Sequence, residues 1–190
     1  MQLGELRAAV ESVCGTGYLT DITRHFNSCL RMLAARSEEM LRITVSITNG
    51  EWTIPDFILL VHSLSLDGQS LPIRVFEPAQ KQSPQGGGGE MSWMKVGNRI
   101  LLHPINNNVM NVDVFYTPRP ARLSADHDVP TLRDVEEVLI AYAIWQIKRD
   151  EDDLQVANEK GSEYYRAEAA WLHLNGKKNP APKRISFNLW

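Results

Sequence analysis

Cysteine is scarce in this chain: Cys14 and Cys29 are the only two among 190 residues. Two cysteines, with no secretory signal peptide in view, suit a reducing cytosol better than a disulfide-stapled secreted protein. Both lie among apolar residues in segments predicted to be helical, so we expect two buried thiols, with a Cys14–Cys29 disulfide as the alternative. Long apolar runs are missing as well. None approaches the roughly 20 residues needed to cross a bilayer, so the sequence predicts no membrane-spanning helix.

Acidic residues are absent from the last eighteen positions, His173 to Trp190. All 23 acidic residues and 16 of the 20 basic residues precede this segment, so residues 1–172 carry a formal charge of −7 within a total of −3. An acidic body argues against a protein that coats nucleic acid with its main surface. The basic end could instead contact phosphate or an acidic partner.

Catalytic and metal-ligand spacings are scarce too. The five histidines are scattered, and none stands at a metal-ligand spacing from another histidine or a cysteine. Asp126-His127-Asp128 could hold a metal ion, although a solvated loop after a proline-rich turn is the favoured interpretation. Asp150 to Asp153 could bind a divalent cation through oxygen ligands, but four acids that complement the dipole of a starting helix are favoured.

Two further motifs have structural interpretations. The run Gly86–Gly89 lacks the Lys-Ser/Thr that follows a phosphate loop, and it reads as a flexible loop. Five aromatic residues near the C-terminal end could form a ligand cage, but at helical spacing they more often pack between helices. These aromatic residues are Tyr142, Trp145, Tyr164, Tyr165 and Trp171. The sequence therefore predicts no catalytic residue, no cofactor and no metal site.

Helical spacing of apolar residues predicts two helices over residues 3–36. The first ends at Gly15-Thr16-Gly17, and the second is expected to begin with Thr20 or Asp21 as its N-cap and to run to about Arg36. The apolar positions of the first are Leu3, Leu6, Val10 and Val13. Those of the second are Ile22, Phe26, Cys29, Leu30 and Leu33.

The apolar period changes to two from Leu41 on, which predicts β-strands. Asn49-Gly50, Asp67-Gly68 and Gly97-Asn98 are turn signals between the strands. The expected strands cover residues 41–54, interrupted by the first of these turns, and then 57–66, 71–76, 93–96, 99–103 and 109–116. Together they predict a small antiparallel β-meander of five or six strands within residues 41–116.

A second pair of helices is predicted over residues 131–172, with Thr131 as N-cap and Asp134 completing a variant of the capping box. The chain is expected to break and restart near Asp150–Asp153. Helices and strands are segregated along the chain, so the predicted fold class is α+β. We expect a four-helix bundle with the sheet inserted between the helix pairs. The predicted domains are residues 1–172 and an extended basic C-terminal arm, residues 173–190.

The arm has the pattern of a segment that needs a partner. Pro180 and Pro182 favour extended backbone, and the apolar residues beyond them alternate with polar ones as in a strand with one buried face. A terminal strand of this kind adds to a sheet edge or groove, on another subunit if its own domain offers none. The alternative is a solvated C-terminus. The predicted binding residues are Lys177, Lys178, Lys183, Arg184, Ile185, Phe187, Leu189 and Trp190.

The order of these elements resembles the head–tail adaptor, or connector, proteins of tailed bacteriophages. The resemblance covers roughly residues 3–172 and rests on the order and spacing of several short passages. The first four are Leu3-Gly-Glu-Leu-Arg7, Leu19-Thr-Asp-Ile-Thr23, Trp52-Thr-Ile-Pro-Asp-Phe57 and Leu64-Ser-Leu-Asp-Gly68. The later ones are Arg99-Ile-Leu-Leu-His-Pro104, Val114-Phe-Tyr-Thr-Pro-Arg-Pro120, and Val138-Leu-Ile-Ala-Tyr-Ala143 followed by Ala157 and Tyr164-Tyr165. The glycine run and the basic arm are not general features of that family.

The resemblance implies a structural virion protein without an active site. It implies a homo-oligomeric ring, usually of twelve copies, that docks under the portal protein, extends the DNA channel and provides the platform for the tail or nozzle protein. Genomic DNA would pass through the ring without specific binding. The expected location is the head–tail junction of a virion assembled in the host cytoplasm, with no membrane partner.

Two other functions remain as alternatives. A tail-completion or stopper protein one ring further down would share the structural class and differ in its neighbours. A small metal-dependent nucleic-acid enzyme, using Asp150–Asp153 or Asp126 and Asp128, belongs to a different class.

Overall fold

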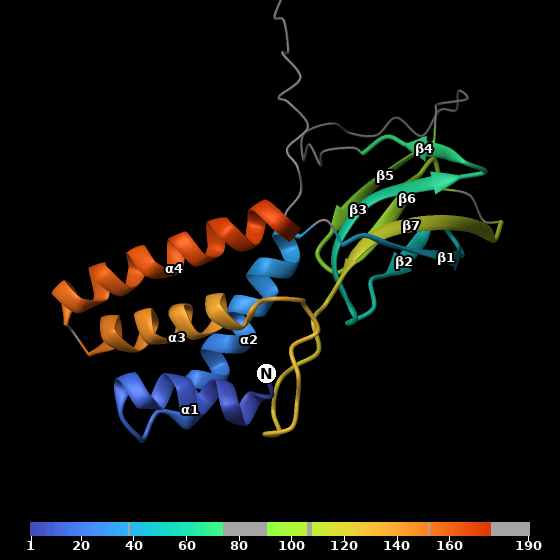
Figure 1. Ribbon diagram of the computed structural model, residues 1–190. Coiled ribbons are helices and arrows are strands. Elements are labelled where there is room, and N and C mark those ends of the chain that lie inside the picture. Colours follow the sequence, from blue (N-terminus) through green and yellow to red (C-terminus); the bar gives the residue numbers. More distant parts are fainter. Residues whose placement is uncertain (38, 74–90, 106–107, 152, 176–190) are drawn as a thin grey trace, which may run out of the picture. The chain divides into compact units, whose positions relative to one another are not determined.

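The computed structural model of the chain describes residues 1–37, 39–73, 91–105, 108–151 and 153–175. These residues form two helices, then seven strands, then two more helices, which confirms the α+β class (Figure 1). The helices are α1 (Leu3–Cys14), α2 (Leu19–Arg36), α3 (Glu136–Asp150) and α4 (Leu154–Asn175). The strands are β1 (Leu41–Ile47), β2 (Glu51–Thr53), β3 (Ile58–Leu66), β4 (Gln69–Leu71), β5 (Ser92–Val96), β6 (Arg99–His103) and β7 (Met110–Pro118).

The chain divides into two compact units. The helical unit contains Met1–Glu38 and Pro120–Trp190, and the strand unit contains Glu39–Arg119. The strand unit is thus inserted in the sequence between the two helix pairs. None of the helices in the described ranges is both long and apolar enough to cross a membrane.

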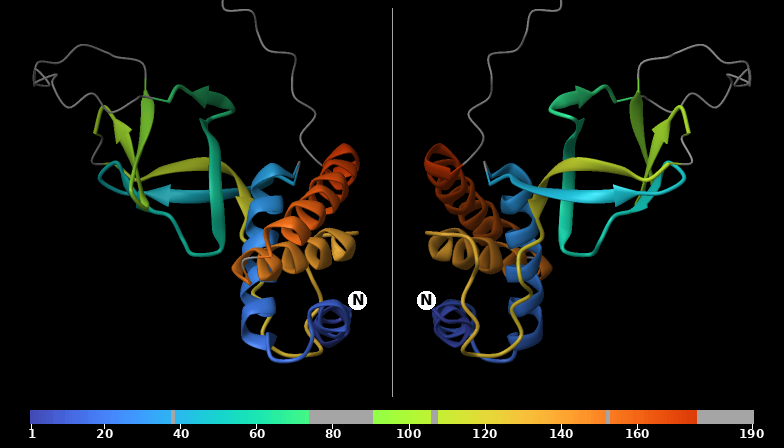
Figure 2. Two further views of the ribbon diagram at one scale, coloured as in Figure 1. Left: turned by 90° about the vertical axis from the view of Figure 1, so that its left-hand side faces the viewer. Right: turned by 90° about the vertical axis from the view of Figure 1, so that its right-hand side faces the viewer.

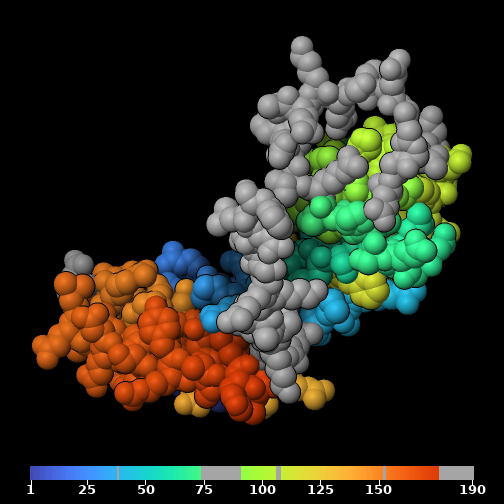
Figure 3. Space-filling view, turned by 90° about the horizontal axis from the view of Figure 1, so that it is seen from above, coloured from blue at the N-terminus to red at the C-terminus, as the bar shows by residue number. Residues whose placement is uncertain are grey.

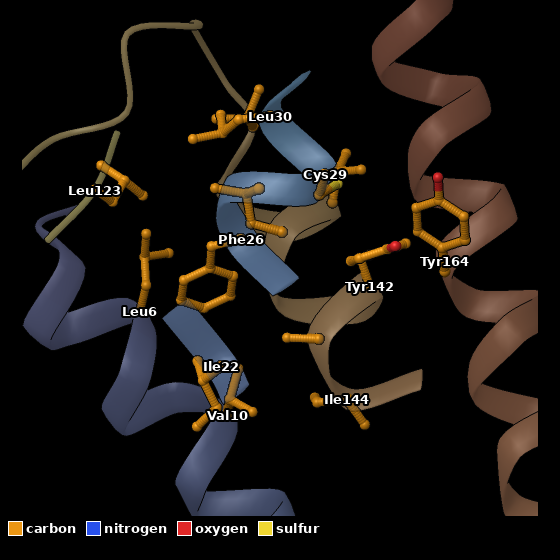
Figure 4. Packing of buried hydrophobic residues seen from close by; sticks show 14 of the residues in the cluster. Leu6, Val10, Ile22, Phe26, Cys29, Leu30, Leu123, Tyr142, Ile144 and Tyr164 are labelled. Atoms are coloured by element: carbon orange, nitrogen blue, oxygen red, sulfur yellow. The ribbon is translucent and has the colours of Figure 1, made fainter. Parts of the chain in front are cut away.

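One apolar core holds the helical unit together. Helix α3 contacts α1, α2 and α4, and Phe26 of α2 lies between Leu6 and Ile22 at the centre of the packing (Figure 4). Leu3, Leu6 and Val10 of α1 are buried as their spacing predicts, whereas Val13 is half exposed. The predicted thiols are free: Cys29 is buried and Cys14 is partly buried. Burial raises the pKa of Cys29 far above its usual value, so this thiol is unreactive.

Two helix starts differ from the sequence prediction. Helix α2 begins at Leu19 with Tyr18 as its N-cap, not at Thr20 or Asp21, and the Tyr18 hydroxyl donates to Glu151 at 2.5 Å. Thr131 does not cap α3, which begins five residues later. Asp134 has a φ of 52°, a left-handed conformation that stops a helix from passing through it. Tertiary contacts, not local capping signals, therefore set both starts.

The predicted break between the last two helices is confirmed. Helix α3 ends at Asp150 and α4 restarts at Leu154, where the Asp153 carboxylate accepts a hydrogen bond from the Val156 backbone N–H at 3.3 Å. The last helix extends three residues beyond its predicted end at residue 172. Helix α4 continues to Asn175, whose side-chain amide donates to the Trp171 carbonyl at 3.3 Å.

The segment 120–135 is an ordered brace of the helical unit. The carbonyls of Asp128 and Asp126 accept from Leu3 and Gly4 at 2.8 and 2.9 Å, which satisfies two free N–H groups at the start of α1. Asn27 of α2 makes two hydrogen bonds with the backbone of Leu123, whose side chain is 1% exposed. The brace thus contacts the start of α1 and the side of α2, two helices that are distant from it in sequence.

The strand unit contains two antiparallel sheets, so the predicted single meander is wrong. The described strands order as β1-β7-β3-β4 in one sheet and β2-β6-β5 in the other (Figure 2). All seven residues of β1 pair with β7, whereas across the Asn49-Gly50 turn the described contact is a single bridge between Thr48 and Glu51. β7 lies far along the chain from β1, so a local pattern cannot reveal this pairing.

The three predicted turns of the strand unit are confirmed. Asn49, Gly50, Asp67, Gly68 and Gly97 all have positive φ angles between 51° and 80°. The strand predicted over 71–76 is shorter and earlier: β4 ends at Leu71, and residues 74–76 lie outside the described residues. The Trp93 N–H donates to the Pro72 carbonyl at 3.0 Å, which links the two sheets beside a shared apolar core.

We expect Leu139→Ala to destabilise the helical unit by about 2–5 kcal/mol, because Leu139 of α3 is 0% exposed and its loss leaves a cavity. Chemical denaturation followed by far-ultraviolet circular dichroism measures this change. Leu174→Ala is the matched control on α4, because its side chain is 77% exposed. A loss below about 0.5 kcal/mol for Leu139→Ala, the range of ordinary surface changes, would contradict the assigned core.

Candidate assembly surface

The predicted binding residues of the arm, from Lys177 to Trp190, lie outside the described residues. The last described residue is Asn175 at the end of α4, next to Leu174, which is 77% exposed. The docking of the arm therefore stays a prediction.

The acidic motifs have structural partners. Asp126 forms an ion pair with Arg7 of α1, and Asp128 accepts from the N–H groups of Ser124 and Ala125 at 2.6 and 2.8 Å. These backbone hydrogen bonds hold the pKa of Asp128 below its usual value. In the described part of the chain, no three His, Cys, Asp or Glu residues come together as a metal site. Asp126 and His127 lie in an exposed loop, as the sequence favoured, with side chains 77% and 83% exposed, and the backbone of this loop is part of the brace.

Glu151, at the turn between α3 and α4, has two hydrogen-bond partners. Glu151 accepts from Lys148 at 2.8 Å and from the Tyr18 hydroxyl at 2.5 Å. The Lys148 hydrogen bond, followed by that of Tyr18, lowers the pKa of Glu151. This turn is therefore tied to the start of α2.

Four of the five aromatic residues, Tyr142, Trp145, Tyr164 and Tyr165, pack on one another between α3 and α4, as the favoured interpretation expected, whereas the Trp171 Nε1–H donates to the Arg133 carbonyl at 2.8 Å. Trp145 stacks on Tyr164 with ring centroids 5.2 Å apart, and Tyr142 meets Tyr164 edge-on at the same distance (Figure 4). Gly161 faces this cluster: a Cβ there would lie 3.0 Å from the Trp145 Nε1 atom. The close approach explains a glycine inside a helix, where it otherwise costs about 1 kcal/mol.

A buried carboxylate connects α4 to the end of α2. Glu168 is 8% exposed and accepts from the Tyr164 hydroxyl at 2.7 Å and from Arg36 at 2.5 Å. Burial, followed by the hydrogen bond to Glu168, raises the pKa of Tyr164. A buried charge with two donors is satisfied, and removing either donor would leave it partly unpaired.

His25 of α2 is 8% exposed, and its Nε2 atom has no hydrogen-bond partner in the described part of the chain. Its ring meets Tyr142 edge-on at 6.2 Å. Burial lowers the pKa of His25, and the nearby charge of Arg24 lowers it further. The imidazole is therefore neutral at pH 7, as a packed core residue and not as a metal ligand.

A groove of about 810 Å³ runs along the surface between α3 and α4. Figure 3 shows the α4 side of the helical unit in orange and red. The groove has an apolar lining, in which several side chains are small, and a charged rim. Its apolar lining is Ile140, Ala141, Ile144, Ala167 and Ala170, and its rim is Met1, Glu136, Glu137, Glu163 and Arg166. A shallow apolar groove with a charged rim suits contact with another protein surface.

The sequence prediction missed this groove. A sign of it was present in the composition of residues 138–147. This segment is apolar around most of its circumference, more than packing against a single helix would bury. Such a helix needs neighbours on several sides. The pairing that leaves a groove beside Ala167 is a tertiary property.

Comparison with known proteins identifies one family. The family model described as SU10 adaptor protein matches residues 1–178, which include both units. No curated protein matches the chain.

The neutral state of His25 predicts a pH-dependent stability. The folded state holds the pKa of His25 below the unfolded value of about 6.5, so the unfolded state binds more protons in acid. Stability is fully present above that value and falls as the pH drops below it. We expect His25→Phe to flatten the dependence of the unfolding free energy between about pH 7 and 5.

His127→Gln is the control for this measurement, because its side chain is 83% exposed. Chemical denaturation at a series of pH values supplies the data. An unchanged slope in His25→Phe would show that His25 is not the group that titrates on unfolding.

Proposed function

Because the chain belongs to the SU10 adaptor protein family, a family of bacteriophage structural adaptors, we propose that it forms the head–tail adaptor ring docked beneath the portal. The match over residues 1–178 carries this proposal, since it takes in both units and the end of α4. In the virion the ring extends the DNA channel and offers a platform for the tail. Twelve copies, the usual number in rings of this kind, surround the channel.

The charge of the body supports passage of DNA without binding. Residues 1–172 carry −7, and a wall of that sign repels phosphate groups and lets the genome slide. A basic wall would release counterions and hold the DNA. We propose that the helical unit forms the ring wall and that the strand unit contacts the next tail component.

Ring closure needs two different surfaces on each copy that meet head to tail. The α3–α4 groove supplies a concave surface of the required kind, and a convex surface of the next copy is its proposed occupant. Glu137 on the rim has no ion-pair partner among the described residues, so it is free to pair with that copy. Ala167 and Ala141 let another chain approach the helix backbones closely.

The arm supplies specific attachment in this proposal. Lys177, Lys178, Lys183 and Arg184 steer it toward an acidic surface of the portal or of a neighbouring subunit. Ile185, Phe187, Leu189 and Trp190 then anchor it, each contributing about 1.5–3 kcal/mol before the cost of ordering. Around a ring, many weak arms give firm attachment through multivalency.

Deletion of residues 176–190 tests the attachment role. We expect the truncated chain to keep its helical circular dichroism, since the last residues of the helical core, Trp171 and Leu172, precede the deletion, and to fail to join portal-containing heads. Co-sedimentation with heads and plaque complementation measure the outcome. A full-length chain with residues 185–190 scrambled is the control for length and charge. Infectious particles built from truncated protein would show that the arm is dispensable.

Substitution in the groove tests the ring contact separately. We expect Ala167→Arg to weaken ring assembly at least tenfold with the fold intact, because the long cation fills the groove. Ala169→Arg is the matched control: it lies on the same helix, is exposed and does not line the groove. Mass photometry of the purified chains measures assembly. Equal assembly by the two variants would remove the groove from the ring contact.

A further inference from the structure

β1 has an edge without a strand partner. It is the outermost strand of its sheet and pairs only with β7, apart from the single bridge between Thr48 and Glu51 beyond its end. Within the described residues, nothing pairs with the outer edge of Leu41–Ser46. Every second backbone N–H and C=O of this edge is therefore available to another strand.

This edge lacks the features that usually prevent strands from pairing. Its register with β7 runs unbroken from Leu41 to Ile47, without a bulge, a proline or a glycine. Its one charged residue, Arg42, is held by Asp113 at 2.8 Å. Proteins normally protect long regular edges with bulges, prolines or inward charges, and an edge without them is a template for another chain.

The two faces of β1 define what a new strand should look like. On one face Leu41 is 44% exposed, and Ile43 and Val45 are only partly covered by the apolar core of the strand unit. On the other face Thr44 donates to Asp113 at 2.6 Å and Ser46 to Asn111 at 2.8 Å. An added strand would bury most surface if three alternating apolar residues lay on one face and small polar residues on the other.

The end of the chain has this pattern. Ile185, Phe187 and Leu189 alternate with Ser186 and Asn188. Fifteen residues follow the described end of α4, so a strand over 185–190 leaves nine residues as a connection. Nine extended residues span about 30 Å, which is enough to reach a second molecule of this size.

The other outer strands are poorer acceptors. β2 and β4 each have three residues, and β5 already bridges to Ile73 through Trp93 and carries an exposed lysine, Lys95. β4 pairs with β3 only over residues 64–66 of β3, and the rest of that side of β3 is interrupted by register shifts between Ile58 and Leu60 and between Val61 and Ser63. The unbroken seven-residue edge of β1 is therefore the best match for a six-residue segment among the described strands.

We propose that residues 185–190 of one copy add as a strand to the outer edge of β1 in the neighbouring copy. The inference rests on the proposed ring, and it selects the neighbouring subunit from the two partners open to the arm. Each copy donates one strand and accepts one, a head-to-tail relation that repeats around a closed ring. Main-chain hydrogen bonds supply affinity, and the alternating side chains set the register.

Disulfide trapping between two versions of the full chain tests the contact. One version carries Thr44→Cys on the polar face of β1, and the other carries Asn188→Cys. Both carry Cys14→Ser, and Cys29 is left in place because it is buried and unreactive. With the two cysteines on different chains, every link is intermolecular. Mixed chains are oxidised mildly at high concentration, and mass spectrometry identifies the linked peptides.

Side-chain alternation gives the experiment its internal control. Ser186→Cys and Asn188→Cys lie on the face of Thr44, whereas Phe187→Cys lies on the opposite face. We expect disulfide links between Thr44→Cys and a cysteine at position 186 or 188 to be at least tenfold more abundant than links from a cysteine at position 187. Lys95→Cys on β5 is the matched acceptor control, because it is also exposed on a strand. Links that are equally abundant from 186, 187 and 188, or with Lys95→Cys, would overturn the added strand.

Failure of this contact is distinguishable from failure of the ring. If no link forms while deletion of 176–190 still blocks joining to heads, the arm binds the portal, and the β1 contact is wrong while the adaptor function stands. If the intact chain does not associate with heads at all, the proposed function fails. A link at Thr44 with the expected alternation in ring-sized particles supports both.

Discussion

The burial of α3 among the other three helices is the contact on which the helical unit depends. Helices α1 and α2 each contact α3 more than they contact each other, and α4 packs on it through the Tyr142, Trp145 and Tyr164 rings. Apolar burial of this kind is non-directional, so it holds helices together without deciding their angles. The brace 120–135, the Glu168 hydrogen bonds and the close approach at Gly161 restrict the arrangement further.

Several buried polar groups of the helical unit have partners within it, although the Nε2 atom of His25 has none among the described residues. Asn27 and Glu168 bind partners from distant parts of the chain, and Asp128 binds the backbone of Ser124 and Ala125. Such satisfied networks favour one arrangement over others. What remains open lies at the surface: the α3–α4 groove and the outer edge of β1. Open grooves and edges are what a protein that works by assembly requires.

The sequence predicted neither of these surfaces, only a segment that we propose binds one of them. The basic arm with alternating apolar residues was visible as a segment in need of a partner, because its charge and period are local properties. The edge that we propose as its acceptor was not visible, because the free edge of β1 exists only once β7 has paired with the other side. The groove was missed for the same reason, since residues of α3 and α4 line it together. The backbone contacts of the Asp126 to Asp128 trio were missed because the partners, Leu3 and Gly4, are far away in sequence.

The sequence by itself determined the α+β class, the extent of α1, the positive-φ turns at Asn49-Gly50 and Asp67-Gly68, and the break before Asp153. Each depends on side-chain spacing, glycine-like backbone freedom or capping within a few residues. The tertiary structure decided the two-sheet order, the late start of α3 and the end of α4 at Asn175. These depend on which distant residues meet, since burial and strand pairing reward contacts that no local pattern specifies.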